Sequence, residues 1–112
     1  MPPKDPKLRN ITIKTGVVKR LAKEKTMYEK ETAQQEAKIE KMKADGKDEY
    51  DIKKMIEVKG ESAAMIMDCL NRLKKAHQEL KTILDNDTDY AESEEYKAAQ
   101  DVYSDASSVI SA

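Results

Sequence analysis

Residue types that build β-rich or disulfide-stabilised proteins are scarce in this chain of 112 residues. It has no Trp, no Phe, three Gly, three Pro and a single cysteine, Cys69. One cysteine excludes a disulfide within the chain and suits a reducing compartment. No apolar run approaches the ~18–20 residues of a membrane span, and the start MPPKDPKLRN lacks an apolar signal-peptide core. We therefore expect a soluble intracellular protein with no membrane partner.

Charge is abundant but nearly balanced. Charged residues make up 38% of the chain, and 21 basic residues against 22 acidic ones leave a net charge of −1. This balance gives no whole-chain reason to expect nucleic-acid binding. A composition rich in Ala, Glu, Lys and Leu is typical of long helices.

The stretch from Ile52 to Asp85 shows the clearest periodicity. With Ile52 at position a of a heptad, apolar residues fill most of the a, d and e positions. Such a stripe is wider than a two-stranded coiled-coil seam, so it predicts a helix with two neighbours. The apolar members are Ile52, Met55, Ile56, Ala63, Ile66, Cys69, Leu70, Leu73, Ala76, Leu80, Ile83 and Leu84.

Local signals mark the ends of three helices. Asp5-Pro6 predicts a helix start, and apolar residues every three or four positions predict a first helix over about 6–44 that runs through Gly16. Asp45-Gly46 predicts its end and a cap at Asp48 predicts a second helix over about 48–85.

A third helix is expected over about 88–109, with Asp89 and Glu92 at capping-box spacing. Together the segments predict one all-α domain over residues 1–112. We expect an antiparallel three-helix bundle, spectrin-like with left-handed coiled-coil packing, in which two helices are long and the third is shorter.

Folding the two long helices about Gly46 sets their register. With equal rise along both, residue i faces roughly residue 94 − i. The polar interruptions of the two stripes then coincide, since Thr32 and Gln35 face Ser62 and Lys59. A matched polar layer is expected of a specified register, because a polar group facing leucine would be penalised.

The first helix is basic near its start, and the third helix is acidic. In an up-down-up bundle, residues 4–25 and 85–105 lie side by side, so we interpret the basic cluster as charge complementarity plus solvation. The basic cluster lacks interleaved aromatic residues and any recognised nucleic-acid motif, which argues against such a partner.

No constellation in the sequence predicts catalysis, a metal or a cofactor. Asp85, Asp87 and Asp89 have calcium-loop spacing, but Tyr90 occupies the place of the required glycine. His77 lacks a second histidine and is interpreted as a packed boundary residue, while Cys69 is interpreted as an inert buried thiol. We therefore expect no enzyme, but a binding or structural protein.

Several stretches resemble the tubulin-binding cofactor A family of small three-helix tubulin-folding chaperones. They are IKTGVVKRLAKEKTMYEKE (13–31), YDIKK (50–54), MIMDCLNRL (65–73) and AESEEYKAA (91–99). One departure is visible, because many members have proline where this chain has Met67, which puts a family kink in the second helix in doubt.

The resemblance implies a cytoplasmic, cytoskeleton-associated protein that captures quasi-native β-tubulin released by the chaperonin. It would hold that subunit for other tubulin-folding cofactors, which assemble the α/β heterodimer. No nucleotide or metal is implied. Members are described as monomers in some lineages and dimers in others, so a homodimer stays open. The alternative is a structural helical-bundle adaptor that only oligomerises.

One of two surfaces is expected to bind the partner, and if it is the second, the first closes on itself or dimerises. The short third helix leaves an arm, residues 31–63, with an apolar stripe that has lost one neighbour. Beside this stripe lie Lys53, Glu57, Gly60 and Glu61. The alternative surface is the outer face of the first helix, with Lys19, Lys23 and Lys30.

Overall fold

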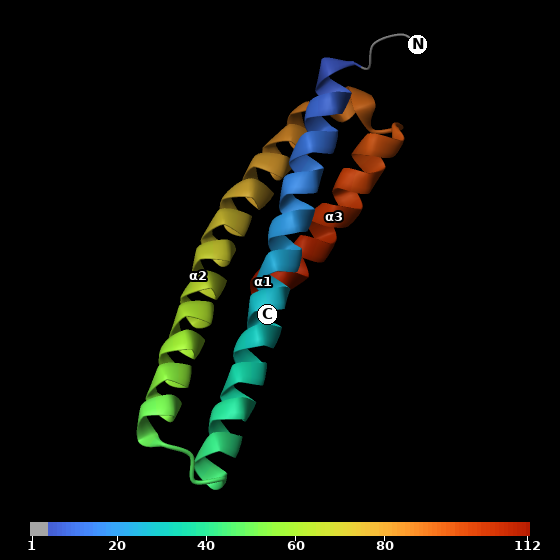
Figure 1. The fold of residues 1–112 in the computed structure, drawn as a ribbon. Helices are drawn as coiled ribbons and strands as arrows, with labels where there is room; N and C mark the ends of the chain where they lie inside the picture. The colour runs from blue at the N-terminus through green and yellow to red at the C-terminus, as the bar shows by residue number, and fades with distance from the viewer. Residues whose placement is uncertain (1–4) are drawn as a thin grey trace.

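The structure, a computed structural model, describes residues 5–112. Its elements are α1 (Pro6–Ala44), α2 (Glu49–Asn86), a 3₁₀ turn η1 (Thr88–Tyr90) and α3 (Glu94–Ser111). The long helices α1 and α2 form an antiparallel hairpin, and α3 returns beside the half of the hairpin that lies away from its turn (Figure 1). The predicted all-α three-helix bundle is confirmed, and no strand occurs among the described residues.

Local caps set the ends of the long helices. The Asp5 carboxylate accepts a hydrogen bond from the Lys7 backbone N–H at 2.8 Å, and Asp48 accepts one from Tyr50 at 2.9 Å. Gly46 adopts φ of 69° in the hairpin turn, a left-handed conformation that favours glycine. As predicted, α1 runs through Gly16 without a break.

The predicted start of the third helix is wrong. Residues 88–90 form only a 3₁₀ turn, and α3 begins at Glu94 with Ser93 as its cap, whose Oγ accepts from the Tyr96 N–H at 3.1 Å. The Asp89–Glu92 capping box therefore does not start the α-helix. Tertiary bonds explain the difference, because the Tyr96 hydroxyl donates to the Leu84 carbonyl at 2.6 Å and holds the chain in a tight reversal.

Ion pairs across the hairpin confirm the predicted register. Lys7 lies 3.8 Å from Asp87, which is its partner under the 94 − i rule. The Lys14–Glu79 pair at 3.5 Å and the Lys59–Glu36 pair at 3.4 Å each fall one residue from that rule. The rule therefore describes the hairpin from its open end to the arm.

The polar layer lies at the predicted level of the arm but is incompletely bonded. Ser62 is buried there, while Thr32 Oγ1 and Gln35 Oε1 are buried without a hydrogen-bond partner. Unpaired buried polar atoms weaken packing, because each has lost its bonds to water. The arm is thus less tightly specified than the rest of the hairpin.

The core lies where α3 covers the hairpin. Its members come from all three helices: Ile11, Val18, Leu21, Leu73, Ala76, Leu80, Leu84, Tyr96, Ala99 and Ala106. Along the e positions of α2, Leu84 is buried beside α3, whereas Ile56 in the arm is 46% exposed. The third helix, and not the heptad pattern alone, therefore decides how much of the α2 stripe is buried.

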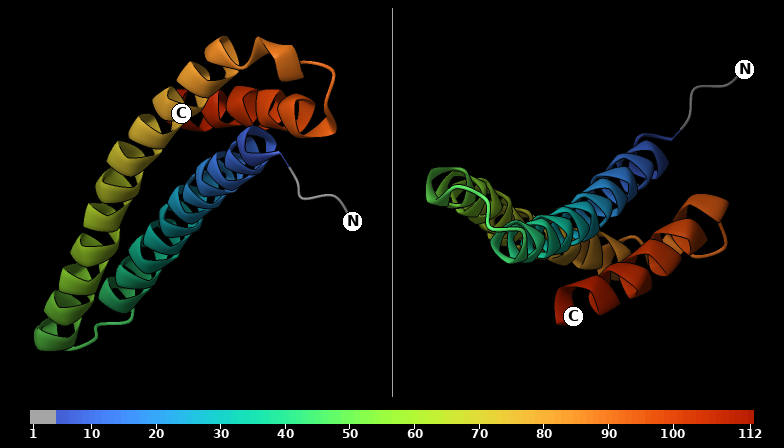
Figure 2. Two further views of the ribbon diagram at one scale, coloured as in Figure 1. Left: turned by 90° about the horizontal axis from the view of Figure 1, so that it is seen from above. Right: turned by 60° about the horizontal axis from the view of Figure 1, so that its bottom comes forward.

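The molecule is elongated, with extents of 64 × 30 × 17 Å. The helix α2 is continuous from Glu49 to Asn86 and curves smoothly (Figure 2). Met67, which stands where many family members have proline, lies in this unbroken helix with its side chain 57% exposed.

Candidate functional site

Groups that could support chemistry have structural roles here. Within residues 5–112, no three His, Cys, Asp or Glu side chains are grouped to hold a metal ion. In the same part of the chain, none of the helices combines the length and apolar character needed to cross a membrane. Burial raises the pKa of the Cys69 thiol, and the Glu24 and Asp68 carboxylates add to the shift, so the thiol stays protonated at neutral pH.

His77 connects α2 to α3. Its ring stacks on Tyr103 with centroids 3.9 Å apart, and its Nε2 lies 3.0 Å from the Tyr103 carbonyl and 2.9 Å from Ser107 Oγ. When Nε2 carries the ring proton, it donates to the Tyr103 carbonyl, which can only accept. The predicted packing role of His77 is therefore confirmed.

Three exposed lysines of α1, which we call the lysine face, lie on one side of the helix. Lys19, Lys23 and Lys30 follow one another at spacings of four and seven residues, which places them on one stripe of an α-helix. Among the described residues, no carboxylate lies within 4.0 Å of any of their ammonium groups. The lysine face is therefore an unpaired positive surface.

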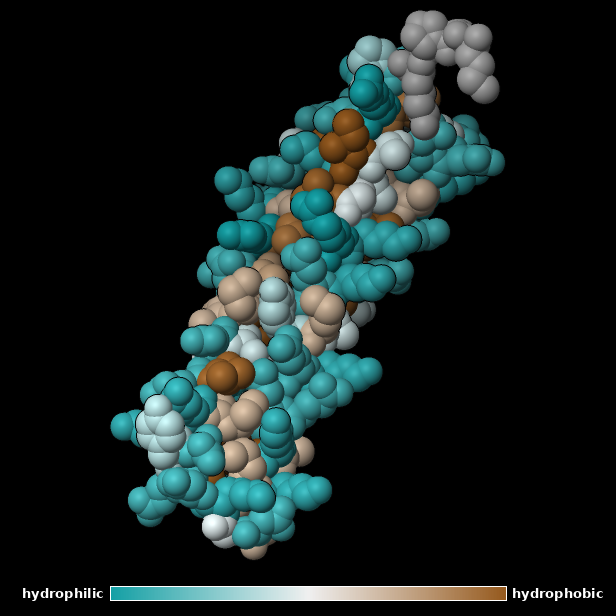
Figure 3. Space-filling model, in the orientation of Figure 1, coloured by the Kyte–Doolittle hydropathy of each residue, from teal (hydrophilic) through white to brown (hydrophobic). Residues whose placement is uncertain are grey.

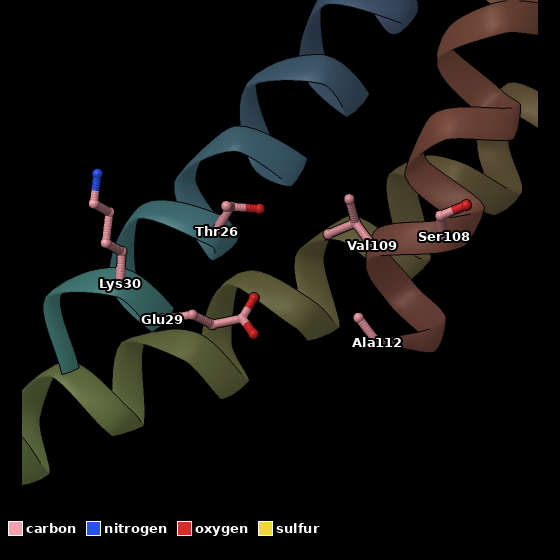
Figure 4. Close-up of a pocket in the computed structure, with 6 residues that line it drawn as sticks. All are labelled: Thr26, Glu29, Lys30, Ser108, Val109 and Ala112. Atoms are coloured by element: carbon pink, nitrogen blue, oxygen red, sulfur yellow. The ribbon is translucent and has the colours of Figure 1, made fainter. Parts of the chain in front are cut away.

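Two hollows adjoin the lysine face where α3 ends. The side hollow is lined by Ala22, Lys23, Thr26, Met27, Lys30 and Val109. The end hollow is lined by Thr26, Glu29, Lys30, Ser108, Val109 and Ala112. Figure 4 shows Thr26 and Glu29 directed toward the end of α3, while Lys30 extends away to the outer rim. The two hollows share Val109 as part of their apolar floor.

Sequence reasoning missed the role of Lys25. Its side chain is only 3% exposed, and its Nζ donates to Glu29 Oε1 at 2.9 Å and to the Val109 carbonyl at 3.3 Å. A cation near the last carbonyls of a helix interacts favourably with the helix dipole. Lys25 thus links the end of α3 to α1 through Val109, which lines both hollows. Lys25 lies four positions after Leu21 and three before Tyr28, on the apolar stripe of α1, and a charged residue at such a position was the available signal.

Lys53, Glu57, Gly60 and Glu61, which we call the arm ridge, form a second surface. All four are exposed on α2 beside Ile56. By the hairpin register they lie opposite about residues 33–41 of α1, which is nearer the turn than the lysine face. The structure therefore keeps the two predicted surfaces separate.

Among residues 5–112, no salt bridge joins α1 to α3 itself. The predicted basic and acidic stretches are linked directly by the Lys7–Asp87 ion pair at 3.8 Å and by a hydrogen bond of 2.8 Å from the Tyr90 hydroxyl to Asp5, both near the η1 turn. The end of α3 is linked to α1 by the bond from Lys25 to the Val109 carbonyl. The opposite charges of α1 and α3 therefore attract one another without direct contact, and the three lysines of the lysine face stay free for a partner.

The comparisons with known proteins agree with one another. A model of the family described as Tubulin binding cofactor A matches residues 6–103. Tubulin-specific chaperone A of Gallus gallus is 59% identical over 98 residues, which cover 88% of this chain and 91% of that protein.

Two solved structures share the fold over most of their length. The human tubulin chaperone cofactor A gives a TM-score of 0.80 at 53% identity and covers 91% of this chain and 99% of its own. Tubulin folding cofactor A from Arabidopsis thaliana gives 0.84 at 39% identity, with coverage of 91% and 96%. The matching sequence, the shared bundle and the family model lead to one conclusion, that this chain belongs to the tubulin binding cofactor A family.

Proposed function

We propose that this protein captures β-tubulin as a folding intermediate and holds it for other tubulin-folding cofactors. Its family membership identifies it as a tubulin-folding chaperone, and its relatives are named as chaperones and cofactors, which are not enzymes. We further propose that the client is the β subunit, that it passes to other cofactors, and that the protein acts in the cytoplasm near the cytoskeleton.

Exposed apolar side chains along an elongated surface are the observation that most supports capture. In Figure 3, apolar side chains form a broken line down the long axis between charged ones. Across the described residues, the large hydrophobic side chains that are exposed are those of Ile13, Met27, Tyr50, Ile56, Val58, Met65 and Met67, on α1 and α2. A client that still exposes apolar area can bury it against such a surface, and charged neighbours would set its orientation.

Two docking surfaces are proposed, the arm with its ridge and the lysine face. The arm offers partly exposed apolar residues, such as Ile56, beside the carboxylates of Glu57 and Glu61. The lysine face offers unpaired ammonium groups beside two hollows. A large client can contact both, because they lie at successive levels of one rod.

The test is co-migration of purified protein with β-tubulin in size-exclusion chromatography. The Glu57→Lys/Glu61→Lys variant should weaken capture if the arm docks, and Lys19→Glu/Lys23→Glu should weaken it if the lysine face docks. Circular dichroism would confirm that helicity is unchanged. If wild-type protein binds no β-tubulin and only self-associates, the structural adaptor is correct and capture is excluded.

A further inference from the structure

We propose that the lysine face and the side hollow recognise an acidic segment that places one apolar side chain in the hollow. The inference rests on the proposed function, because the segment would belong to the captured client. It adds the chemical class of the contact, with carboxylates on Lys19, Lys23 and Lys30 and an apolar group against Met27 and Val109.

Charge complementarity is the first support. The three ammonium groups are exposed and lack carboxylate partners within the described chain. Lys19 and Lys30 are eleven positions apart, which is about 16 Å along a helix axis at 1.5 Å per residue. A segment with several carboxylates spread over that length would pair with all three at little cost in desolvation, because the lysines stay at the rim.

The apolar floor is the second support. Met27 is 55% exposed and lies beside Ala22 and Val109 in the side hollow. A methionine is unbranched and polarisable, so it adapts to apolar groups of different shape. Ala22 is too small to fill the space between α1 and the end of α3, which leaves room for one inserted side chain.

The neighbouring acidic groups define where the contact is strongest. Asp105 lines a further hollow together with Lys19, so it lowers the positive potential at that end. Glu29 is engaged by buried Lys25. The stretch between Lys23 and Lys30 is therefore the most favourable for carboxylates. No aromatic side chain lines the side hollow, which disfavours stacked bases and hence nucleic acid.

Cross-linking tests the chemistry of the segment directly. A photoreactive benzophenone amino acid replaces Met27 in the full chain, and the cross-linked β-tubulin peptide is identified by mass spectrometry. We expect a peptide with an apolar residue flanked by Asp or Glu. A cross-linked peptide that is neutral or basic would overturn the inference while leaving capture itself established.

Charge reversal measures the contribution of the lysines. Lys23→Glu/Lys30→Glu should lower the affinity for β-tubulin about tenfold or more at low salt, and the loss should shrink as salt rises. The matched control is Lys75→Glu/Lys97→Glu, which changes net charge equally at two exposed lysines elsewhere. Equal losses in the two variants would contradict recognition by the lysine face.

A probe without tubulin separates this inference from the proposed function. A synthetic peptide of glutamates around a single leucine should shift the NMR methyl signal of Met27, and the same peptide with lysines should not. If wild-type protein captures no β-tubulin but this shift occurs, the proposed function fails and the acidic-segment site stands. If neither peptide shifts the signal, the inference is wrong.

Discussion

Lys25 is a cation in the interior of a small bundle, and its partners explain why it is tolerated. Its ammonium group is satisfied by the Glu29 carboxylate and by the Val109 carbonyl. Replacement by methionine keeps the length of the side chain but removes both bonds. We expect Lys25→Met to lower the free energy of unfolding by about 1–3 kcal/mol, because hydrogen bonds made by a charged group usually contribute about that much.

Urea denaturation measures this loss, with Lys75→Met as the control. Lys75 is exposed, so its replacement should change stability by no more than about 0.5 kcal/mol. If the Lys25→Met protein is as stable as the control, burial of the ammonium group must destabilise the fold by as much as its two hydrogen bonds stabilise it.

The bond between Tyr90 and Asp5 makes the joint between α1 and η1 sensitive to pH. The Tyr90 hydroxyl, followed by the Lys7 backbone N–H, holds the pKa of the Asp5 carboxyl below its ordinary value of 3.8. This depressed pKa contributes stability that is present above about pH 3.8 and is lost as pH falls through the lowered value. The same bond raises the pKa of Tyr90 above its ordinary value of 10.0. The stability that this shift contributes is present below about pH 10 and is lost as pH rises through the raised value.

Tyr90→Phe should therefore be less stable than wild type at neutral pH, and this gap should narrow as pH falls below the Asp5 pKa. Thermal melting between pH 7 and pH 2 measures it. Tyr50→Phe is the control, because Tyr50 is exposed in the arm and should show no such gap. A gap for Tyr90→Phe that stays constant with pH would mean that Asp5 is not its cause.

Single residues were predictable where their partners are local. The caps at Asp5 and Asp48 were identified because each bonds a backbone N–H two residues away. Lys25 bonds a carbonyl 84 positions along the chain, which no local pattern encodes.

At the scale of the helices, replacing glycine by alanine has two opposite effects, one inside a helix and the other in a turn. A Cβ added at Gly16 or Gly60 would meet nothing within 4 Å, and both lie inside helices. Gly16→Ala and Gly60→Ala should each raise the free energy of unfolding by about 0.5–1 kcal/mol, because alanine restricts the unfolded chain and favours helix.

Gly46→Ala is the opposite case and serves as the control. Its Cβ would also meet open space, but the positive φ of 69° disfavours any L side chain. We expect a loss of about 1 kcal/mol, which chemical denaturation would detect. A gain at Gly46 would show that the turn relaxes to another conformation.

The heptad phase of α2 can be tested by one inward and one outward residue. Leu73 is fully buried, and Leu73→Ala should cost about 2–5 kcal/mol through lost transfer energy and a cavity. Lys53→Ala, on the exposed arm ridge, should stay within about 0.5 kcal/mol. Similar shifts in melting temperature would contradict the phase.

The ends of α1 and α2 were predicted more accurately than the start of α3. Around the third helix, Asp89 and Ser93 are both acceptable caps by local sequence. The choice of Ser93 depends on where Tyr96 finds its acceptor, the Leu84 carbonyl of another helix. The local sequence pattern therefore predicts that a third helix exists, whereas a tertiary contact determines the residue at which it begins.

The whole molecule has a half covered by α3 and an arm without that cover. The covered half contains the apolar core, while in the arm the unpaired Thr32 Oγ1 and Gln35 Oε1 interrupt the packing. Backbone amides of the arm should therefore exchange with solvent faster than those near Leu73 and Leu80. Native-state hydrogen exchange measures this difference.

A matched variant tests the cause of that difference. Thr32→Val with Gln35→Leu removes the unpaired polar atoms and should slow exchange in the arm while leaving the covered half unchanged. Uniform protection along both long helices in the wild type would contradict the division into two halves.

The candidate site shows the limit of sequence reasoning at this scale. The lysine face was predictable from spacing on one helix. The apolar floor was not predictable, because Val109 and Met27 line the same hollow only as a result of how α3 ends against α1. Which of the two proposed surfaces binds the client remains a prediction.

The position of the core at the open end of the hairpin has a kinetic consequence. Leu21 and Leu73 meet there, although the Gly46 turn and most of both helices lie between them. A hairpin that forms from its turn outward buries little apolar surface in its first steps. The entropy lost in closing it must therefore be offset largely by helix formation. The core also needs Tyr96, Ala99 and Ala106 from the last helix. During synthesis, the nascent chain therefore cannot complete its own core until nearly all of it has left the ribosome.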